Sequence, residues 1–249
     1  IQSTDASNRI EGISTSDSRL NDLVSEKVTP RNRNEEEIAG YRDALSVIHE
    51  SHDYIPITPN VILQLHRDLF RHTPLTFAGH FKDSDNVIIE RDAHGTSTVR
   101  FAPPSALATP ELIERACSAY TQAIRDGHTD PLLAIAMFIL DFICIHPFND
   151  GNGRMSRLLT LLMLCRNGYM VGKYISIEHL IEQSKSIGVF FLGIGMFFYF
   201  DRIKRAAVFD QQVDLIHILI AIEIERKFKD ASVIVTFYNL GDHKTFKKC

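Results

Sequence analysis

Residues 131–166 hold the pattern that decides the fold, and they read PLLAIAMFILDFICIHPFNDGNGRMSRLLTLLMLCR. An apolar run over 132–145 is followed by a short segment rich in glycine and asparagine, and then by a leucine-rich run. Pro147 cannot continue a helix and disfavours helical geometry at His146, so the first helix should end there. The stretch predicts two helices joined by a tight loop. The helix 132–145 is apolar almost all round and is expected to be the central buried element.

The second helix of this pair and three others have clear boundaries in the sequence. The second helix is predicted over 154–166, because Asn167-Gly168 provides a stop. Apolar residues at three- and four-residue spacing predict a helix over 35–51. Thr58-Pro59 and Thr109-Pro110 begin two more, since proline is favoured just inside a helix start. The expected fold class is all-α.

The segment 81–102 breaks this helical pattern. Residues 87–89 and 96–101 are rich in β-forming side chains and flank the turn-forming residues 92–95. This arrangement predicts a β-hairpin carried by the helical domain.

The C-terminal segment 185–249 has weaker patterns. Its uncharged stretch 186–200 is shorter than the roughly 18–20 residues that a bilayer requires, so a buried helix is favoured over a membrane segment. A further helix is predicted over 210–229 and a short strand over 232–238. The sequence assigns no role to this segment.

The composition of the chain is that of a globular protein and argues against several other classes. Apolar residues make up 45% and charged residues 23%, which excludes a disordered or fibrous chain. With 27 basic and 31 acidic residues the net charge is −4, so nucleic-acid binding is disfavoured. Four scattered cysteines without a C-x-x-C pair fit a reducing compartment, and no signal-peptide block stands at the start. A cytoplasmic location without a membrane partner is expected.

The loop between the two central helices contains the side chains that phosphoryl or nucleotidyl transfer requires. Main-chain N–H groups in a Gly- and Asn-rich loop before a helix bind anions. Asp150 supplies one carboxylate, the usual protein share of a Mg²⁺ site. Arg154 and Arg157 are three residues apart on one helix, and guanidinium groups recognise phosphate oxygens. His146 is able to take a proton from a nucleophile near neutral pH.

The segment from His146 to Arg157 resembles the defining motif of Fic-domain proteins, His-x-Phe-x-Asp/Glu-Gly-Asn-Gly-Arg with a second Arg three residues on. The resemblance implies a Fic-type helical domain that transfers AMP from MgATP to a Ser, Thr or Tyr hydroxyl of a target protein and releases pyrophosphate. It implies His146 as the general base and Asp150 as the Mg²⁺ ligand. The nucleotide-binding residues that it implies are Asp150, Gly151, Asn152, Gly153, Arg154 and Arg157.

Two further positions of the motif refine this resemblance. Phe148 is implied to point into the core. Doc-like kinases, a related branch, have lysine at the position of Gly153, so glycine there favours adenylylation over phosphorylation.

The predicted hairpin also resembles a feature of this family, a flap that covers the nucleotide and pairs with the backbone of the target. Asn86-Val87-Ile88-Ile89 resembles its functional strand, and the resemblance implies that Val87, Ile88 and Ile89 also belong to the nucleotide-binding residues. The resemblance therefore implies that the target protein docks on this strand by strand addition.

The start of the chain resembles the inhibitory pattern of one subclass of the family, Ser/Thr-x-x-x-Glu-Gly/Asn. Ser7, Glu11 and Gly12 occupy its defining positions. The resemblance implies that the Glu11 carboxylate lies against Arg157, where it blocks the γ-phosphate. The expected division is an inhibitory segment 1–22, a Fic core 23–184 that includes the flap 81–102, and a C-terminal segment 185–249.

The leading hypothesis is thus an autoinhibited protein adenylyltransferase that modifies a target protein or itself. Two alternatives stay open: a hydrolase that removes AMP with the help of Glu11, and a nucleotide-sensing interaction module. A homo-oligomer is also left open. Relatives of this type contact adenine through a Tyr and an Asn, and neither residue is identified after Ser184.

Overall fold

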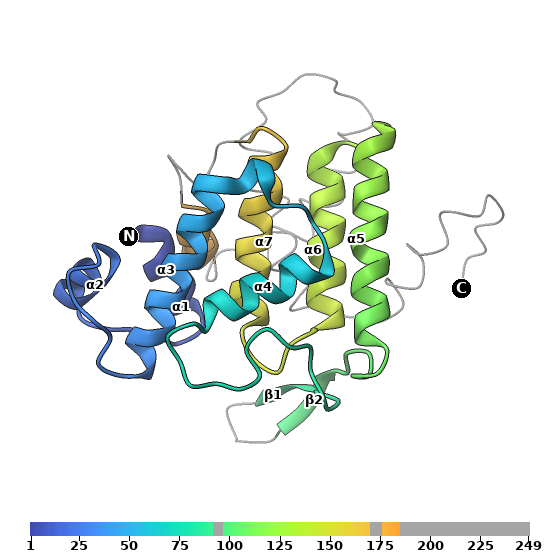
Figure 1. The fold of residues 1–249 in the computed structure, drawn as a ribbon. Helices are drawn as coiled ribbons and strands as arrows, with labels where there is room; N and C mark the ends of the chain where they lie inside the picture. The colour runs from blue at the N-terminus through green and yellow to red at the C-terminus, as the bar shows by residue number, and fades with distance from the viewer. Residues whose placement is uncertain (92–96, 170–175, 185–249) are drawn as a thin grey trace.

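The computed structural model of the chain describes residues 1–91, 97–169 and 176–184. The predicted turn 92–95 and the whole segment 185–249 lie outside these residues, and so do the helix and strand predicted within that segment. Among the described residues the fold is mostly helical (Figure 1). The helices are α1 (Gln2–Ile10), α2 (Asp17–Val24), α3 (Arg33–Ser51), the 3₁₀ turn η1 (His52–Tyr54), α4 (Pro59–Leu69), α5 (Thr109–Asp126), α6 (Pro131–Ile145), α7 (Asn152–Arg166) and α9 (Ile177–Ser184).

Side-chain caps explain where several helices begin. The side chains of Asn32, Thr58 and Asp130 each accept a hydrogen bond from a main-chain N–H of the first turn of α3, α4 and α6. A cap of this kind satisfies a donor that the helix itself leaves without a partner. The helices predicted within the described residues are present, and α3 starts two residues earlier than expected because Asn32 provides its cap.

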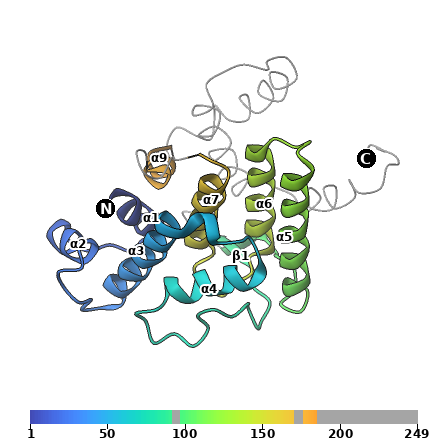
Figure 2. The same cartoon turned by 45° about the horizontal axis from the view of Figure 1, so that its top comes forward.

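The centre of the fold is α7, which lies between α3 on one side and α6 and α5 on the other, while α4 crosses it (Figures 1 and 2). All of its residues except Gly153 and Arg166 are buried. The prediction that 132–145 is the central element is wrong, since α6 leaves Leu133 exposed. The sequence does not indicate that α7 is buried, because its first turns are polar. Buried arginine, serine and asparagine side chains are stable only when partners elsewhere in the fold satisfy them, and the sequence does not show those partners.

The segment 81–102 contains two short strands, β1 (Ile88–Arg91) and β2 (Ser97–Phe101). They pair antiparallel, with Ile89 opposite Val99 and a register shift between Ile88 and Ile89. The pair lies at the end of the bundle where α6 connects to α7 (Figure 1). Val87 directly precedes β1, and its side chain is exposed.

The N-terminal helix α1 is attached to the opposite end of the described chain. Arg9 donates two hydrogen bonds to the Glu182 carboxylate of α9, at 2.9 and 2.8 Å. The Ser3 hydroxyl donates to the hydroxyl of Ser176 at 3.0 Å. Ala6 and Ser7 are fully buried beneath these contacts. Helices α1 and α9 therefore lie side by side (Figure 2).

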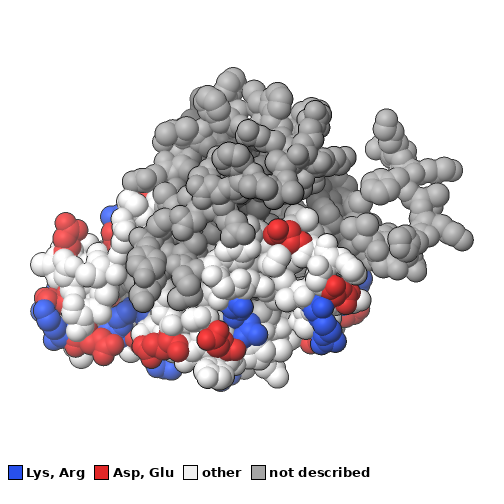
Figure 3. Space-filling view, turned by 90° about the horizontal axis from the view of Figure 1, so that it is seen from above, with Lys and Arg blue, Asp and Glu red and all other residues white. Residues whose placement is uncertain are grey.

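Surface charge, helix hydropathy and the state of the cysteines each bear on an expectation from the sequence. On the face seen in Figure 3, acidic and basic side chains alternate over short distances. No helix within the described ranges has the length and hydropathy needed to cross a membrane. Of the described cysteines, Cys117 and Cys165 are free thiols.

Gly40 sets how closely α3 approaches α4. A Cβ atom at this position would overlap the main-chain carbonyl oxygen of Leu69, at the last residue of α4. The backbone fixes the position of the Cβ atom, and the neighbouring oxygen is also a main-chain atom, so no side-chain rotation relieves the overlap. The space at Gly40 is therefore required by the packing of the two helices.

We expect Gly40→Ala to destabilise the protein although alanine is the better helix former. The gain in helix propensity is about 1 kcal/mol, whereas forcing atoms into a filled core costs about 1–3 kcal/mol or more. Ser46→Ala, at an exposed position of the same helix, is the matched control and should be close to neutral. Urea unfolding of both variants measures the difference, and a stabilised Gly40→Ala protein would contradict the packing argument.

Candidate active site

The connection between α6 and α7 begins with a strained residue, His146. Its backbone lies in the left-handed region, at φ 50 and ψ 61, which non-glycine residues rarely adopt. The His146 N–H still donates to the carbonyl of Phe142 at 3.0 Å. The chain then turns sharply out of the helix, and the imidazole is half-buried at the helix end.

Lys82 and Asn86 hold this turn from the segment that precedes the hairpin. The main-chain N–H of Lys82 donates to the Pro147 carbonyl at 2.8 Å, and its ammonium donates to the Ile145 carbonyl at 3.1 Å. The Asn86 amide donates to the carbonyls of His146 and Phe148, at 3.5 and 3.4 Å. Burial lowers the pKa of Lys82. The strain at His146 is thus compensated by four contacts from a neighbouring segment.

Asn152 closes the loop upon itself. Its side-chain oxygen accepts from the Phe148 N–H at 2.9 Å, and its amide donates to the Phe148 carbonyl at 2.7 Å. Phe148 is fully buried, as expected. Because both ends of the Asn152 amide are engaged inside the loop, only its main-chain N–H, at the start of α7, is available to an anion.

Asp150 is the half-exposed carboxylate of the loop, with 44% of its side chain accessible. It accepts a hydrogen bond from the Gly151 N–H at 2.6 Å, and the guanidinium of Arg33 lies 3.5 Å away. Within the described part of the chain no group of three or more His, Cys, Asp or Glu side chains could hold a metal ion. A single carboxylate is what a Mg²⁺ ion carried by nucleotide phosphates requires from the protein. Asp150 therefore fits such an ion.

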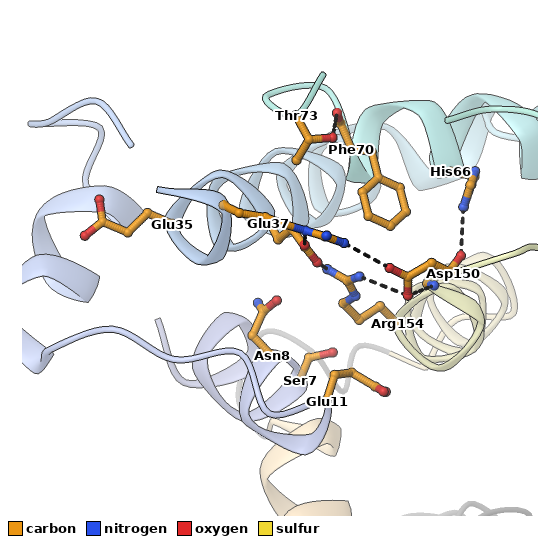
Figure 4. A network of polar contacts seen from close by, with 12 residues as sticks. Ser7, Asn8, Glu11, Glu35, Glu37, His66, Phe70, Thr73, Asp150 and Arg154 are labelled. Atoms are coloured by element: carbon orange, nitrogen blue, oxygen red, sulfur yellow. Dashed lines mark hydrogen bonds and ion pairs between the residues drawn. The ribbon is translucent and has the colours of Figure 1, made fainter. Parts of the chain in front are cut away.

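Arg154 is buried and held in place by Glu37 of α3. The two side chains are 2% and 4% exposed, and the Arg154 Nη1 to Glu37 Oε2 distance is 2.6 Å. Glu37 also accepts from Arg33, and the Arg154 guanidinium lies 5.0 Å from the centre of the Phe70 ring. Figure 4 shows the chain of contacts from Glu37 through Arg154 to Asp150. The sequence gives no signal for Glu37, since a glutamate in the first turn of a helix is ordinary.

Arg157 is buried against α1, where the sequence analysis expected the Glu11 carboxylate. Its Nη2 donates to Glu11 Oε1 at 2.7 Å and to the Ser7 carbonyl at 3.0 Å, and its Nε donates to the Ser7 hydroxyl at 2.8 Å. A Cβ atom at Gly153 would overlap the Glu11 carboxylate. Glycine at 153 therefore permits this close approach, and Gly12 follows α1 with a positive φ of 79.

A buried carboxylate that the sequence analysis missed, Glu178 of α9, completes the polar cluster. It accepts hydrogen bonds from the Tyr41 hydroxyl at 3.0 Å and from the Ser176 hydroxyl at 3.1 Å. Burial, together with Glu178, raises the pKa of Tyr41 well above its usual value, so the phenol keeps its proton and donates. Helices α3 and α9 thus support the surroundings of Ser7 and Arg157.

His66 of α4 contacts the loop from the other side (Figure 4). Its Nε2 lies 3.1 Å from the Asp150 carbonyl oxygen, and its ring stacks on Phe148 with the ring centres 3.7 Å apart. Burial lowers the pKa of His66 to about 4, so the ring is neutral near pH 7. The sequence places His66 among apolar residues of a helix, which gives no indication of this contact.

The structure therefore brings most of the predicted site residues together at one end of α7. His146, Asp150, Gly151, Asn152, Gly153, Arg154 and Arg157 lie on the connection and the first turns, and Ser7 and Glu11 reach them from α1. Ile88 and Ile89 lie in β1, and Val87 precedes it. These three are linked to the connection through the neighbouring Asn86.

Comparison with known proteins relates this site to a known family. Residues 56–164 match the model of the Fic/DOC family. A Fido domain-containing protein of Dictyostelium discoideum is 37% identical over 90 residues, which cover 34% of this chain and 58% of the relative. The protein adenylyltransferase Fic of Nematostella vectensis is 25% identical over 171 residues, covering 66% and 37%. The chain thus spans about three fifths or less of these relatives.

The fold is also similar to that of a solved protein structure. The crystal structure of a Fic domain-containing signalling protein from Bacteroides thetaiotaomicron superposes with a TM-score of 0.58 at 22% identity, over 89% of this chain and 79% of that one. At this identity the likeness shows a shared Fic fold.

We expect Glu37→Ala to destabilise the protein by about 3–5 kcal/mol, because it leaves the buried Arg154 guanidinium without its carboxylate. Glu36→Ala is the matched control, one residue away and only half-buried. Chemical denaturation of the two variants gives the comparison. Similar losses in both would mean that Glu37 contributes no more than an ordinary first-turn glutamate.

Proposed function

We propose that this chain is an autoinhibited protein adenylyltransferase, which transfers AMP from MgATP to a Ser, Thr or Tyr hydroxyl of a target protein or of itself. The observation that carries the proposal is the connection 146–157. Within twelve residues it combines an imidazole at the end of α6, a half-exposed carboxylate, the start of α7 and two buried guanidinium groups.

The chemistry follows from the nature of these groups. His146 takes the proton of the target hydroxyl as its oxygen forms a bond to the α-phosphorus of ATP. The bond from that phosphorus to the bridging oxygen breaks, and pyrophosphate leaves with the electron pair. Asp150 would hold Mg²⁺, which neutralises charge on the phosphate oxygens. The main-chain N–H groups of Gly151, Asn152 and Gly153 add donors to the phosphates.

The two arginines differ in how free they are to bind phosphate. Glu37 keeps Arg154 in one orientation, so this guanidinium is pre-organised for a phosphate oxygen. Arg157 instead has Glu11 as its anionic partner. We assign the γ-phosphate to Arg157, and Glu11 then occupies the position that this phosphate needs. ATP that binds beside Glu11 is held in a pose that does not present the α-phosphorus to the hydroxyl.

We expect Glu11→Gly to raise auto-adenylylation by about tenfold to a hundredfold, the scale on which misplacement by about 1 Å affects rates. Incorporation of label from α-labelled ATP measures it, with γ-labelled ATP as the control for kinase chemistry. Adding His146→Ala to Glu11→Gly should remove label by a factor of about 10²–10⁴, because the general base is lost.

Three results would count against the proposal. Equal labelling of the wild type and Glu11→Gly would contradict the inhibitory role of Glu11. Label from the γ-position would indicate a kinase. Release of AMP from a modified protein that depends on Glu11 would indicate the reverse, hydrolytic reaction.

We expect Asp150→Ala to weaken MgATP binding, because the loop loses the carboxylate that would hold the ion. Titration calorimetry with and without Mg²⁺ measures the effect, and the affinity for ATP without Mg²⁺ should change much less. Asn149→Ala, exposed and adjacent, is the control. Unchanged MgATP affinity in Asp150→Ala would exclude a metal role for this residue.

The strand β1 is the proposed docking site of the target. It is one of two paired strands, it lies beside the connection through Asn86, and Val87, which directly precedes it, is 51% exposed. An extended segment of the target would add to this strand through main-chain hydrogen bonds.

We expect Val87→Pro or Ile89→Pro to reduce target modification more than MgATP binding, because proline lacks the N–H that strand addition uses. Labelling of a target in lysate and calorimetry with MgATP separate the two effects. An equal loss of both would mean that the strand serves the nucleotide or the fold instead.

A further inference from the structure

The side chain of His66 has two well-defined polar contacts, and together they fix its tautomer. The main-chain N–H of Gly79 donates to His66 Nδ1 at 2.9 Å, so Nδ1 carries no proton. The proton of the neutral ring is therefore on Nε2, which donates to the Asp150 carbonyl at 3.1 Å. His66 is fully buried, and its ring is parallel to that of Phe148 within 1°. Phe70 packs edge-on against the same ring at 5.1 Å.

This contact controls one peptide unit of the candidate active site. The carbonyl of Asp150 and the N–H of Gly151 belong to the same peptide, and no cis peptide bond occurs in the described chain. In a trans peptide the C=O and N–H point in opposite directions. Because His66 draws the carbonyl toward the core, the Gly151 N–H points away from His66. There it donates to the Asp150 carboxylate at 2.6 Å.

The alternative orientation of this peptide is sterically accessible. Gly151 has φ 82, and a flip of the preceding peptide would bring it to negative φ, which glycine adopts equally well. The flip would exchange the two groups, so that a carbonyl oxygen rather than an N–H would face the side of the Asp150 carboxylate. A carbonyl oxygen there would repel a phosphate. The backbone alone does not prevent this, because the strain that opposes a flip at other residues is absent at glycine.

We propose that His66 is a positioning residue that fixes the Asp150–Gly151 peptide, through its Nε2–H bond to the Asp150 carbonyl, in the orientation that directs the Gly151 N–H to the anion side. The inference rests on the proposed use of this loop for MgATP. It adds to that function a residue outside the loop, from α4, that touches neither the reacting atoms nor the metal.

Wild-type protein gives the first test, by long-range ¹H–¹⁵N correlation of histidine rings in the full chain. We expect the Nε2–H tautomer for His66, with a slowly exchanging proton. The Nδ1–H tautomer would overturn the proposal, since the donor to the Asp150 carbonyl would not exist. This measurement requires no variant and no nucleotide.

Two variants separate the hydrogen bond from the packing. His66→Phe keeps an aromatic ring for Phe148 and removes the donor, while His66→Gln retains an N–H near the position of Nε2. We expect the Gly151 amide resonance to shift in His66→Phe and MgATP affinity to fall by about tenfold, the effect of an unsatisfied buried carbonyl. His66→Gln should recover most of both. His128→Phe, at an exposed site, is the control and should match the wild type.

A simple structural role would give a different pattern. It predicts that His66→Phe keeps the wild-type Gly151 resonance and MgATP affinity, or that His66→Gln, which loses the ring stack, is the more impaired variant. Either result would overturn the proposal. If the proposed function is wrong, α-label transfer is absent even when Glu11→Gly is added to the wild type and to each His66 variant, while the tautomer and the Gly151 resonance still report on His66. The two failures are thus distinguishable.

Discussion

Two guanidinium groups are buried in the first turns of α7, and much of the surrounding structure compensates their charge. A buried cation is tolerated only with an anionic or polar partner. Glu37 supplies one for Arg154, and Ser7 with Glu11 supplies the other for Arg157. These requirements fix α3 and α1 against α7. The helix that carries the candidate phosphate ligands is therefore also the packing centre of the domain, and changes in its ligands affect stability as well as binding.

The sequence predicted the parts of the fold that depend on local chemistry. Prolines at the starts of α4 and α5, Pro147 after α6 and the apolar spacing depend only on neighbours in the chain, and these helices occur where expected. The motif from His146 to Arg157 also indicated which groups gather in the site. The contact between Glu11 and Arg157 was anticipated because a family pattern, rather than any local rule, joined these two residues.

The residues that the sequence could not reveal act across the fold. Glu37 sits in a helical first turn, His66 in an apolar helical face, and Lys82 in a loop, and each is ordinary in its own segment. Their roles come from partners far away in the chain, such as the Asp150 carbonyl for His66 and the Ile145 carbonyl for Lys82. The centrality of α7 was missed for the same reason. Its first turns are polar and give no local sign of burial, whereas tertiary contacts satisfy them.

The attachment of α1 to α9 has a thermodynamic consequence. A helix of nine residues is not stable alone in water, so α1 is ordered only while it is docked, and its release is a local unfolding equilibrium. Arg9 and Glu182, which are 173 residues apart in sequence, contribute to that equilibrium although they lie outside the connection between α6 and α7. Each 1.4 kcal/mol removed from the docking energy raises the undocked population about tenfold. The fraction of molecules with a free Arg157 is thus set by contacts at the far end of the described chain.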